Sequence, residues 1–224
     1  MSHVKIEDID VNQLKIAKSS RTVTLRYNNL PFQLATCKLY SPFGVKGTNS
    51  DYSPFTNWTI DCSIDQNNSD ASQLYQTNID LLDTRLIELI KESCNSFNPR
   101  NMEEVDLTGD FYSPILRNNK TWPKLMKISV PRDTKGNLLS VIFDENTEKI
   151  PITDKNIEQI LCKGKVFKAI IEFSKFWIYK GRIGTTWHLI QMKLISKTTK
   201  DKEPEDTEAP NASIYTNNLM LDDN

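Results

Sequence analysis

The sequence predicts an α+β fold that is mainly β, and three observations support this prediction. Several segments alternate between apolar and polar residues, as strands with one buried face do. Residues 70–96 contain neither Gly nor Pro, and their apolar side chains recur at helical spacing. Residues 201–224 hold seven acids, one lysine and two prolines without an apolar period, which predicts a disordered acidic tail.

Length and composition limit the class of protein. A chain of 224 residues is expected to form one domain with attachments and to bury a substantial core. No run of 18 apolar residues is present, and the N-terminus lacks a signal-peptide apolar region, so we expect an intracellular protein without a membrane span. The four cysteines are too scattered for a zinc site, and we expect reduced thiols.

The net charge of −1 conceals a strong asymmetry along the chain. Residues 163–200 hold nine Lys or Arg and a single acid, Glu172, which gives +8, whereas residues 201–224 sum to −6. This pattern favours a polyanionic partner and a regulatory or recruiting tail. An ordinary solvated surface with a solubilising tail is the alternative, and charge alone does not decide between the two.

The first half of the chain is predicted to hold several short strands and one long helix. Residues 11–20 are expected to form a short amphipathic helix within an N-terminal arm, residues 1–20. Residues 21–40 alternate, with a hairpin turn at Asn28-Asn29. Residues 41–57 form a Gly/Pro/Ser-rich loop that is unusually aromatic, and residues 57–65 form a strand. The aromatic residues in and beside this loop are Tyr40, Phe43, Tyr52 and Phe55.

The second half begins with the long helix, whose predicted apolar face holds Leu74, Leu81, Leu82, Leu86, Leu89 and Ile90. Residues 98–123 are expected to be mostly irregular. Residues 124–130 and 138–144 are predicted strands that flank a turn at Lys135-Gly136-Asn137. Residues 153–165 are predicted to contain a short helix with Thr153 as its N-cap. The main domain is expected over residues 21–197 and the tail over residues 198–224.

Residues 167–194 predict a long basic hairpin with a change of face. Its buried positions are odd up to Phe173 and even from Phe176, so a β-bulge is expected at Ser174-Lys175, as in small barrels. If the even face stays in the core past the turn, three rings point outward among cations: Trp177, Tyr179 and Trp187. Rings among lysines suit single-stranded nucleic acid, because bases stack and phosphates need cations. The alternative is that another element covers the rings. His188 is interpreted as a core residue.

The order of these parts resembles the OB-fold single-stranded DNA-binding proteins of large cytoplasmic (nucleocytoplasmic) DNA viruses. The resemblance covers roughly residues 20–196 and rests on "LATCKLYSPFGV", "IELIKES", "KLMKISV", "LLSVIFD" and "FWIYKGRIGTTWHLIQMKL", followed by the acidic tail. It implies an OB-like small β-barrel with an inserted long helix, short flanking helices and a disordered acidic C-terminal tail. It also implies a groove for single strands, a role in viral DNA replication or repair, and no catalysis.

The resemblance and the hairpin pattern together define a predicted binding set. The predicted nucleic-acid-binding residues are Tyr40, Phe43, Lys168, Lys175, Trp177, Tyr179, Lys180, Arg182, Trp187 and Lys193. The predicted partner-binding tip of the tail consists of Leu219, Met220, Leu221, Asp222 and Asp223. The expected partners are single-stranded DNA or RNA, replication proteins and further copies of the chain on DNA. We expect no cofactor or metal, and a location in the host cytoplasm or the virion.

Two other classes of function compete with this prediction. An enzyme is disfavoured because the chain has only two histidines, His3 and His188, and no P-loop, GxSxG or HExxH motif. A viral structural or scaffolding protein would share the fold but bind protein partners through the aromatic loop. Binding of oligo-dT, followed by tryptophan fluorescence, separates a scaffold from a DNA-binding protein.

Overall fold

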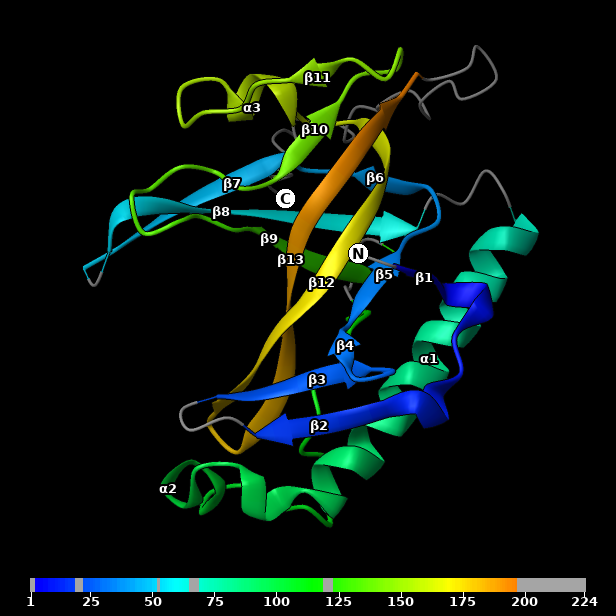
Figure 1. Cartoon of the computed structure of the whole chain (residues 1–224), viewed down its shortest axis with the longest axis vertical. Helices are drawn as coiled ribbons and strands as arrows, with labels where there is room; N and C mark the ends of the chain where they lie inside the picture. Colours follow the sequence, from blue (N-terminus) through cyan, green and yellow to red (C-terminus); the bar gives the residue numbers. More distant parts are fainter. Residues whose placement is uncertain (1–2, 19–21, 52, 65–68, 119–122, 197–224) are drawn as a thin grey trace, which may run out of the picture.

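The computed structural model describes residues 3–18, 22–51, 53–64, 69–118 and 123–196, and most of its regular structure is β (Figure 1). The strands are β1 (Val4–Lys5), β2 (Leu14–Lys18), β3 (Val23–Tyr27), β4 (Leu30–Pro31), β5 (Gln33–Ala35), β6 (Leu39–Ser41), β7 (Val45–Ser50), β8 (Ser53–Ile64), β9 (Leu125–Val130), β10 (Val141–Phe143), β11 (Lys149–Ile150), β12 (Lys165–Tyr179) and β13 (Arg182–Ile195). The α-helices are α1 (Ser69–Glu92), α2 (Pro99–Met102) and α3 (Ile157–Ile160). The mainly β fold with one long helix is confirmed. No helix in the described part of the chain is long and apolar enough to cross a membrane.

Five strands close a ring. β6 pairs with β8, β8 with β9, β12 with β13 and β12 with β6, all antiparallel, whereas β9 and β13 run parallel. This is the five-stranded Greek-key arrangement of an OB-like barrel. Side chains that fill the ring include Leu39, Ile60, Met126, Phe167 and Leu189, all fully buried. The long helix α1 is inserted between β8 and β9 in the sequence.

The β12–β13 hairpin extends beyond the ring and carries two register shifts. One lies between Phe173 and Lys175, so the bulge predicted at Ser174-Lys175 is confirmed. The other skips Ile190, because Ile170 pairs with Gln191 while Ile171 pairs with Leu189. This second bulge reverses the inward face of β13, so Trp187 and Leu189 lie inside together with Met192 and Leu194. The predicted outward orientation of Trp187 is therefore wrong, since its side chain is only 2% exposed.

Trp187 belongs to a chain of aromatic rings that joins the hairpin to the N-terminal sheet β2-β3-β4. Its ring centroid lies 5.7 Å from that of Phe32 and 5.8 Å from that of Phe173, both at steep, edge-on angles. Phe173 contacts Phe176 at 4.8 Å, and Phe176 contacts Phe97 at 5.4 Å. Edge-to-face contacts of this kind add to the free energy gained by burial alone. In Figure 1 the strands β2 and β3 lie across the lower half of the hairpin.

Several local predictions near the N-terminus need correction. Of the segment 11–20, predicted to be helical, the structure describes residues 11–18, which form a single 3₁₀ turn at Val11–Gln13 followed by β2, in which Leu14 is buried and Lys15 exposed. Pairing with β3 satisfies the backbone hydrogen-bonding groups of β2. The turn at Asn28-Asn29 is confirmed, and both residues have positive φ, as this tight hairpin turn requires.

The segment 41–57, predicted to be a loop, is largely strand. β7 pairs with β8 from Val45 to Ser50, and the Trp58 ring lies so close to Gly47 that a Cβ there would come within 2.6 Å of it. The short helix α3 exists, but Thr153 does not cap it. Asn156 precedes α3, and its side-chain oxygen instead accepts a hydrogen bond from the Thr153 amide at 2.7 Å.

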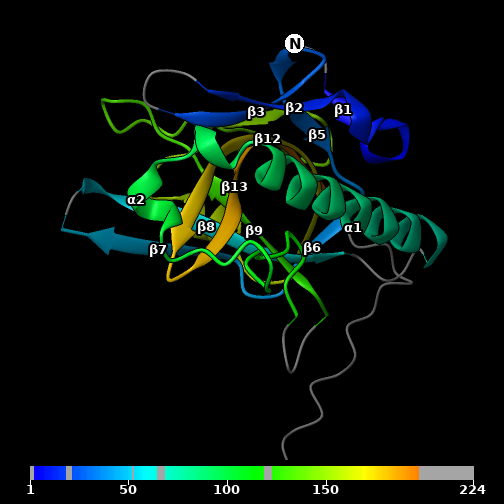
Figure 2. The same ribbon diagram turned by 90° about the horizontal axis from the view of Figure 1, so that it is seen from below.

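Helix α1 connects the N-terminal region to the barrel. Figures 1 and 2 both place it beside β2 and the Ile6–Asp8 turn. Ile79, Leu82 and Leu86 face the core, but Leu74 and Leu81, predicted on the same face, are exposed. The Asp83 carboxylate accepts hydrogen bonds from the Tyr112 hydroxyl (2.7 Å) and the Ile115 amide (3.1 Å). Burial raises the pKa of Asp83 to about 6, against the opposing effect of these two hydrogen bonds.

Replacing Trp187 with Ala is expected to destabilise the protein by about 3–5 kcal/mol, because the variant leaves a large cavity between Phe32 and Phe173. Urea unfolding measures the change. Tyr179→Ala is the matched control, because the Tyr179 side chain is 65% exposed and its loss should change the unfolding free energy by about 0.5 kcal/mol or less. Equal stability of the Trp187 variant and the parent would contradict the buried position.

The raised pKa of Asp83 predicts a pH dependence of stability with a definite sign. Between about pH 4 and 6 the folded protein keeps the Asp83 proton and the unfolded chain releases it, so this contribution to stability is lost as the pH rises through that range. The loss is at most roughly 3 kcal/mol. Asp83→Asn should remove it, so the variant gains stability relative to the parent between pH 4 and 6. Glu158→Gln, at an exposed position on helix α3, should show no such gain.

Candidate nucleic-acid interface

The barrel places side chains from five strands on one continuous outer face. Directly paired residues point to the same side of a sheet, and alternate residues of a strand share a face. Lys46 pairs with Thr59, Thr59 with Ser129, and Ser129 with His188. Thr186 and Gly184 precede His188 by two and four residues and therefore share its face of β13. Thr186 pairs with Lys175, and Gly184 pairs with Trp177. Glu172 pairs directly with His188 and lies on the same side. We call Lys46, Thr59, Ser129, His188, Glu172, Thr186, Lys175 and Trp177 the outer face.

Trp177 is held in one orientation on this face. A Cβ at Gly184 would lie 2.1 Å from the indole ring, so the ring rests directly on the glycine backbone. The indole N–H donates a hydrogen bond to the Thr185 carbonyl oxygen at 3.2 Å. The half-buried ring also borders a pocket of about 150 Å³, which Arg117, Lys127 and Ser129 line from the opposite side. The chain therefore offers an ordered flat ring beside an open space.

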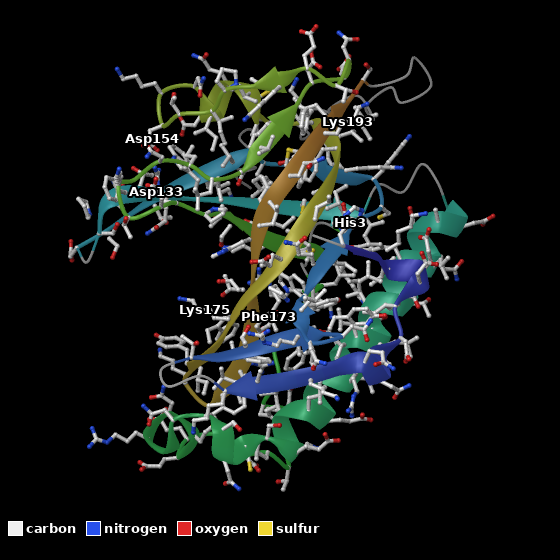
Figure 3. The ribbon with its side chains drawn as sticks, viewed as in Figure 1. His3, Asp133, Asp154, Phe173, Lys175 and Lys193 are labelled. Atoms are coloured by element: carbon white, nitrogen blue, oxygen red, sulfur yellow. The ribbon has the colours of Figure 1, made fainter. Side chains whose placement is uncertain are left out.

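The positive charge of the outer face comes from lysines. Lys175 is exposed, and Figure 3 shows it on the lower half of the hairpin, away from Lys193 at the upper end. Lys46 and Lys127 lie 3.8 and 3.9 Å from the Asp61 carboxylate and share it. His188 is half-buried on this face, not in the core as predicted. Burial lowers the pKa of His188, Glu172 acts in the opposite direction, and Lys175 adds to the lowering.

The tip of the hairpin is occupied by intramolecular contacts. Lys180 and Gly181 form the turn with positive φ, and the Lys180 amine lies 5.3 Å from the Tyr179 ring centroid. Tyr179 is mostly exposed, so the outward direction predicted for Tyr179 and Trp177 is confirmed. The Arg182 guanidinium lies 3.2 Å from the Asp110 carboxylate and donates a hydrogen bond to the Tyr112 carbonyl oxygen at 2.7 Å. Arg182 thus already fastens the segment around Tyr112 to the hairpin.

Most of the remaining predicted residues lie at the other end of β12. Tyr40 pairs with Val166, eleven residues before Trp177, which corresponds to about 36 Å along an extended strand. Lys168 and Lys193 stand opposite each other on β12 and β13. Phe43 is half-buried beneath the Lys46 amine, 4.6 Å from the ring centroid. Phe43 thus borders the outer face through Lys46, whereas Tyr40, Lys168 and Lys193 lie at the far end of the hairpin and Trp187 is buried. The predicted tail tip, residues 219–223, lies outside the described residues.

One further network of polar groups is structural. Arg132 is nearly buried, donates to the Thr56 carbonyl oxygen at 2.7 Å and pairs with Asp154, which also accepts from the Trp58 indole N–H at 2.6 Å. These bonds fasten β8 to the loop before α3. Among the residues the structure describes, no cluster of His, Cys, Asp and Glu could hold a metal ion.

Sequence reasoning missed the part of the outer face that β7, β8 and β9 provide. Lys127 and Ser129 alternate with buried Met126 and Ile128 within "KLMKISV", so the period of that strand was a usable signal. Lys46 had no such signal, because its segment, residues 41–57, was taken for a loop. Thr59 lies in a segment that was predicted as a strand, residues 57–65, but its outward face was not assigned.

The structure is similar to solved structures of phage proteins. The single-stranded DNA-binding protein from bacteriophage Enc34 in complex with single-stranded DNA is 8% identical, with a TM-score of 0.46 over 83% of this chain and 97% of that chain. The single-stranded DNA-binding protein gp2.5 of bacteriophage T7 is 15% identical, with a TM-score of 0.48 over 79% of this chain and 92% of that chain. No curated protein matches the sequence. The model of a family of unknown function (DUF5871) matches residues 61–208, about two thirds of the sequence, and the chain therefore belongs to that family.

Proposed function

We propose that the chain is a non-catalytic protein that binds single-stranded DNA along the outer face. The observation that carries this proposal is the Trp177 ring, which is fixed by Gly184, accessible from a pocket and flanked by Lys175 and Lys127. A base can stack on such a ring whatever its identity, and the lysines can neutralise the neighbouring phosphates. Because the ring is already ordered, binding loses little side-chain entropy.

The position of this surface in the barrel supports the same function by analogy with the fold. OB folds bind oligonucleotides on the face of their second and third strands and on the loops between strands 1 and 2 and between strands 4 and 5. In this barrel those strands are β8 and β9, and the two loops are the β7 hairpin arm and the Lys180-Gly181 turn. The outer face spans the region between these two loops. Because fold alone does not establish function, the proposal rests on the ring and the cations.

The charge of the outer face supports a contact to phosphates rather than to bases alone. Lys175 takes part in none of the ion pairs among the described residues, whereas Arg182 is already paired with Asp110. The lowered pKa of His188 keeps its imidazole mostly neutral near pH 7. Lysine side chains therefore supply the charge that attracts the backbone, and salt should weaken binding.

Finer parts of the sequence prediction remain proposals. They are the choice of DNA over RNA, a role in viral DNA replication or repair, a location in the host cytoplasm or virion, and self-association on DNA. The acidic segment 201–224 is proposed to recruit replication proteins through its tip, but it lies outside the described residues. The scaffolding alternative loses part of its basis, because the aromatic loop is a β-hairpin in which the Phe55 ring packs on Gly136.

Replacing Trp177 with Ala is expected to weaken binding of oligo-dT by about 1–3 kcal/mol while the unfolding free energy stays near that of the parent, because the variant removes a stacking surface and little core. Anisotropy of a labelled oligonucleotide measures binding, and urea unfolding measures stability. Leu81→Ala removes another exposed apolar side chain on the distant helix α1 and should leave binding unchanged. A parent protein that binds no oligo-dT would favour the scaffold over the DNA-binding protein.

Replacing Lys175 with Gln should reduce the salt dependence of binding. On single strands the plot of log K against log[salt] has a slope of about −0.7 per neutralised phosphate, so the variant should be shallower by about 0.7 and weaker for all sequences alike. Lys149→Gln removes an equal charge from the exposed strand β11 and is expected to keep the parent slope. An unchanged slope in the Lys175 variant would exclude a phosphate contact there.

A further inference from the structure

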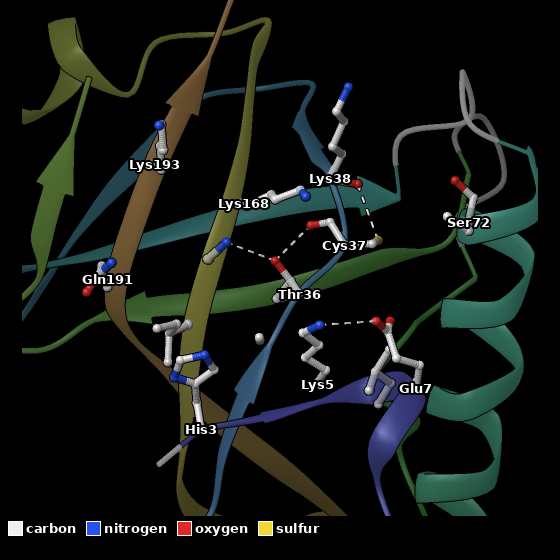
Figure 4. Close-up of a pocket in the computed structure, with 15 residues that line it drawn as sticks. His3, Lys5, Glu7, Thr36, Cys37, Lys38, Ser72, Lys168, Gln191 and Lys193 are labelled. Carbon is white, nitrogen blue, oxygen red and sulfur yellow. Dashed lines mark hydrogen bonds and ion pairs between the residues drawn. The ribbon is translucent and has the colours of Figure 1, made fainter. Parts of the chain in front are cut away.

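A second and larger pocket, of about 480 Å³, lies at the opposite edge of the hairpin (Figure 4). The Trp177 pocket lies where β13 meets β9, whereas this one lies where β12 meets the segments around β1 and β5. Its walls come from β1, the linker between β5 and β6, the first turns of α1, and the facing residues of β12 and β13. Segments from the N-terminal region, helix α1 and the C-terminal hairpin therefore build one cavity.

This cavity is strongly basic. Its lining contains four lysines and a histidine with a single acid, Glu7: the basic residues are His3, Lys5, Lys38, Lys168 and Lys193. The Glu7 carboxylate lies 3.9 Å from the Lys5 amine. The Lys193 amine donates a hydrogen bond to the Thr147 hydroxyl at 2.6 Å. Lys38 and Lys168 are exposed and appear in none of the ion pairs among the described residues. In Figure 4 Lys168 and Lys5 lie on two sides of Thr36.

Two features of the cavity favour an anion over an empty surface. Lys168 and Lys193 are directly opposite on adjacent antiparallel strands, an arrangement in which like charges repel and destabilise the pair. An anion bound between the two lysine amines would be attracted to both and would offset their mutual repulsion. Ala71 and Ser72, from the first turn of the 24-residue helix α1, also line the cavity, and the start of a helix carries partial positive charge.

The lining also indicates which part of a nucleotide the cavity suits. It contains no Phe, Tyr or Trp, and its polar side chains are four lysines, two hydroxyls, the His3 imidazole, the Gln191 amide, the Cys37 thiol and the Glu7 carboxylate. Stacking of a base therefore has no Phe, Tyr or Trp platform here, whereas four lysines border the cavity and are available to phosphate oxygens. The chemistry matches a sugar-phosphate backbone or a free phosphate compound.

We propose that this pocket binds phosphates of the same single strand whose bases stack at Trp177, which makes it a second contact point that rests on the proposed function. Lys168 and Lys175 lie on one strand and, across the Ser174 bulge, project to the same outer side of β12. They are seven positions apart, or about 23 Å of extended strand. A bound strand that reaches both places must run along the hairpin, and a short oligonucleotide occupies only one of them.

The test compares the double variant Lys38→Gln/Lys168→Gln with the charge-matched control Lys149→Gln/Lys155→Gln, whose lysines are exposed and outside both pockets. Labelled oligo-dT of graded length, from about 4 to about 16 nucleotides, is titrated at low and high salt. The double variant should match the control on the shortest oligonucleotide. On the longest it should bind about tenfold more weakly at low salt, with a slope shallower by about 1.4.

Each other result has a definite meaning. A double variant that matches the control at every length, or that weakens all lengths equally, overturns the second contact point while leaving the proposed function intact. A parent that binds no oligonucleotide overturns both. Tighter binding of short oligonucleotides by the double variant assigns the cavity to the acidic segment 201–224 instead. A rise in Tm with inorganic pyrophosphate that the double variant lacks, without any length dependence, assigns it to a free phosphate ligand.

Discussion

The pairing of β12 with β13 is the constraint on which the remaining structure depends, because β6 and β9, two of the three other strands of the ring, pair with one of these two strands. β5 and β6 pair with β12, and β9, β10 and the backbone around Tyr112 pair with β13. A single straight hairpin could bury only one set of alternate residues. The bulges at Ser174 and Ile190 change that set twice, so one hairpin supplies Phe167 to the barrel core and Trp187 to the aromatic cluster.

The two bulges also explain where sequence reasoning succeeded and where it failed. On β12 the apolar positions move from odd to even numbers between Phe173 and Phe176, with polar Ser174 and Lys175 between them, so the bulge was visible. On β13 Leu189 and Ile190 are consecutive and both apolar, so the apolar pattern fits either odd or even inward positions. The bulge could therefore not be detected from the sequence. The error for Trp187 follows from that one position. β2 was missed for a different reason, since its short apolar pattern becomes a strand only through pairing with β3.

The residues of the candidate site also differ in whether a local sequence pattern could predict them. Lys175 and Trp177 could be found from the alternation of one strand, because local spacing decides which face a side chain occupies. The contribution of Ser129 depends on the parallel pairing of β9 with β13, which joins residues about sixty positions apart and leaves no local signal. The ion pair of Arg182 with Asp110 is equally non-local, and it converts a predicted phosphate contact into a structural one. The basic cavity required the N-terminus to reach β12, which no periodicity could indicate.

Gly184 connects the fold of the hairpin with the chemistry of the outer face. Its φ is not positive, so the chain does not need glycine there for backbone conformation. It needs the absence of a side chain, because any Cβ would occupy the space of the Trp177 ring. The ring consequently lies flat on the sheet, its indole N–H is satisfied by a backbone carbonyl, and one side remains accessible from the pocket. The same close approach that orders the ring also limits its burial, which explains how an aromatic residue can be both fixed in place and available for stacking.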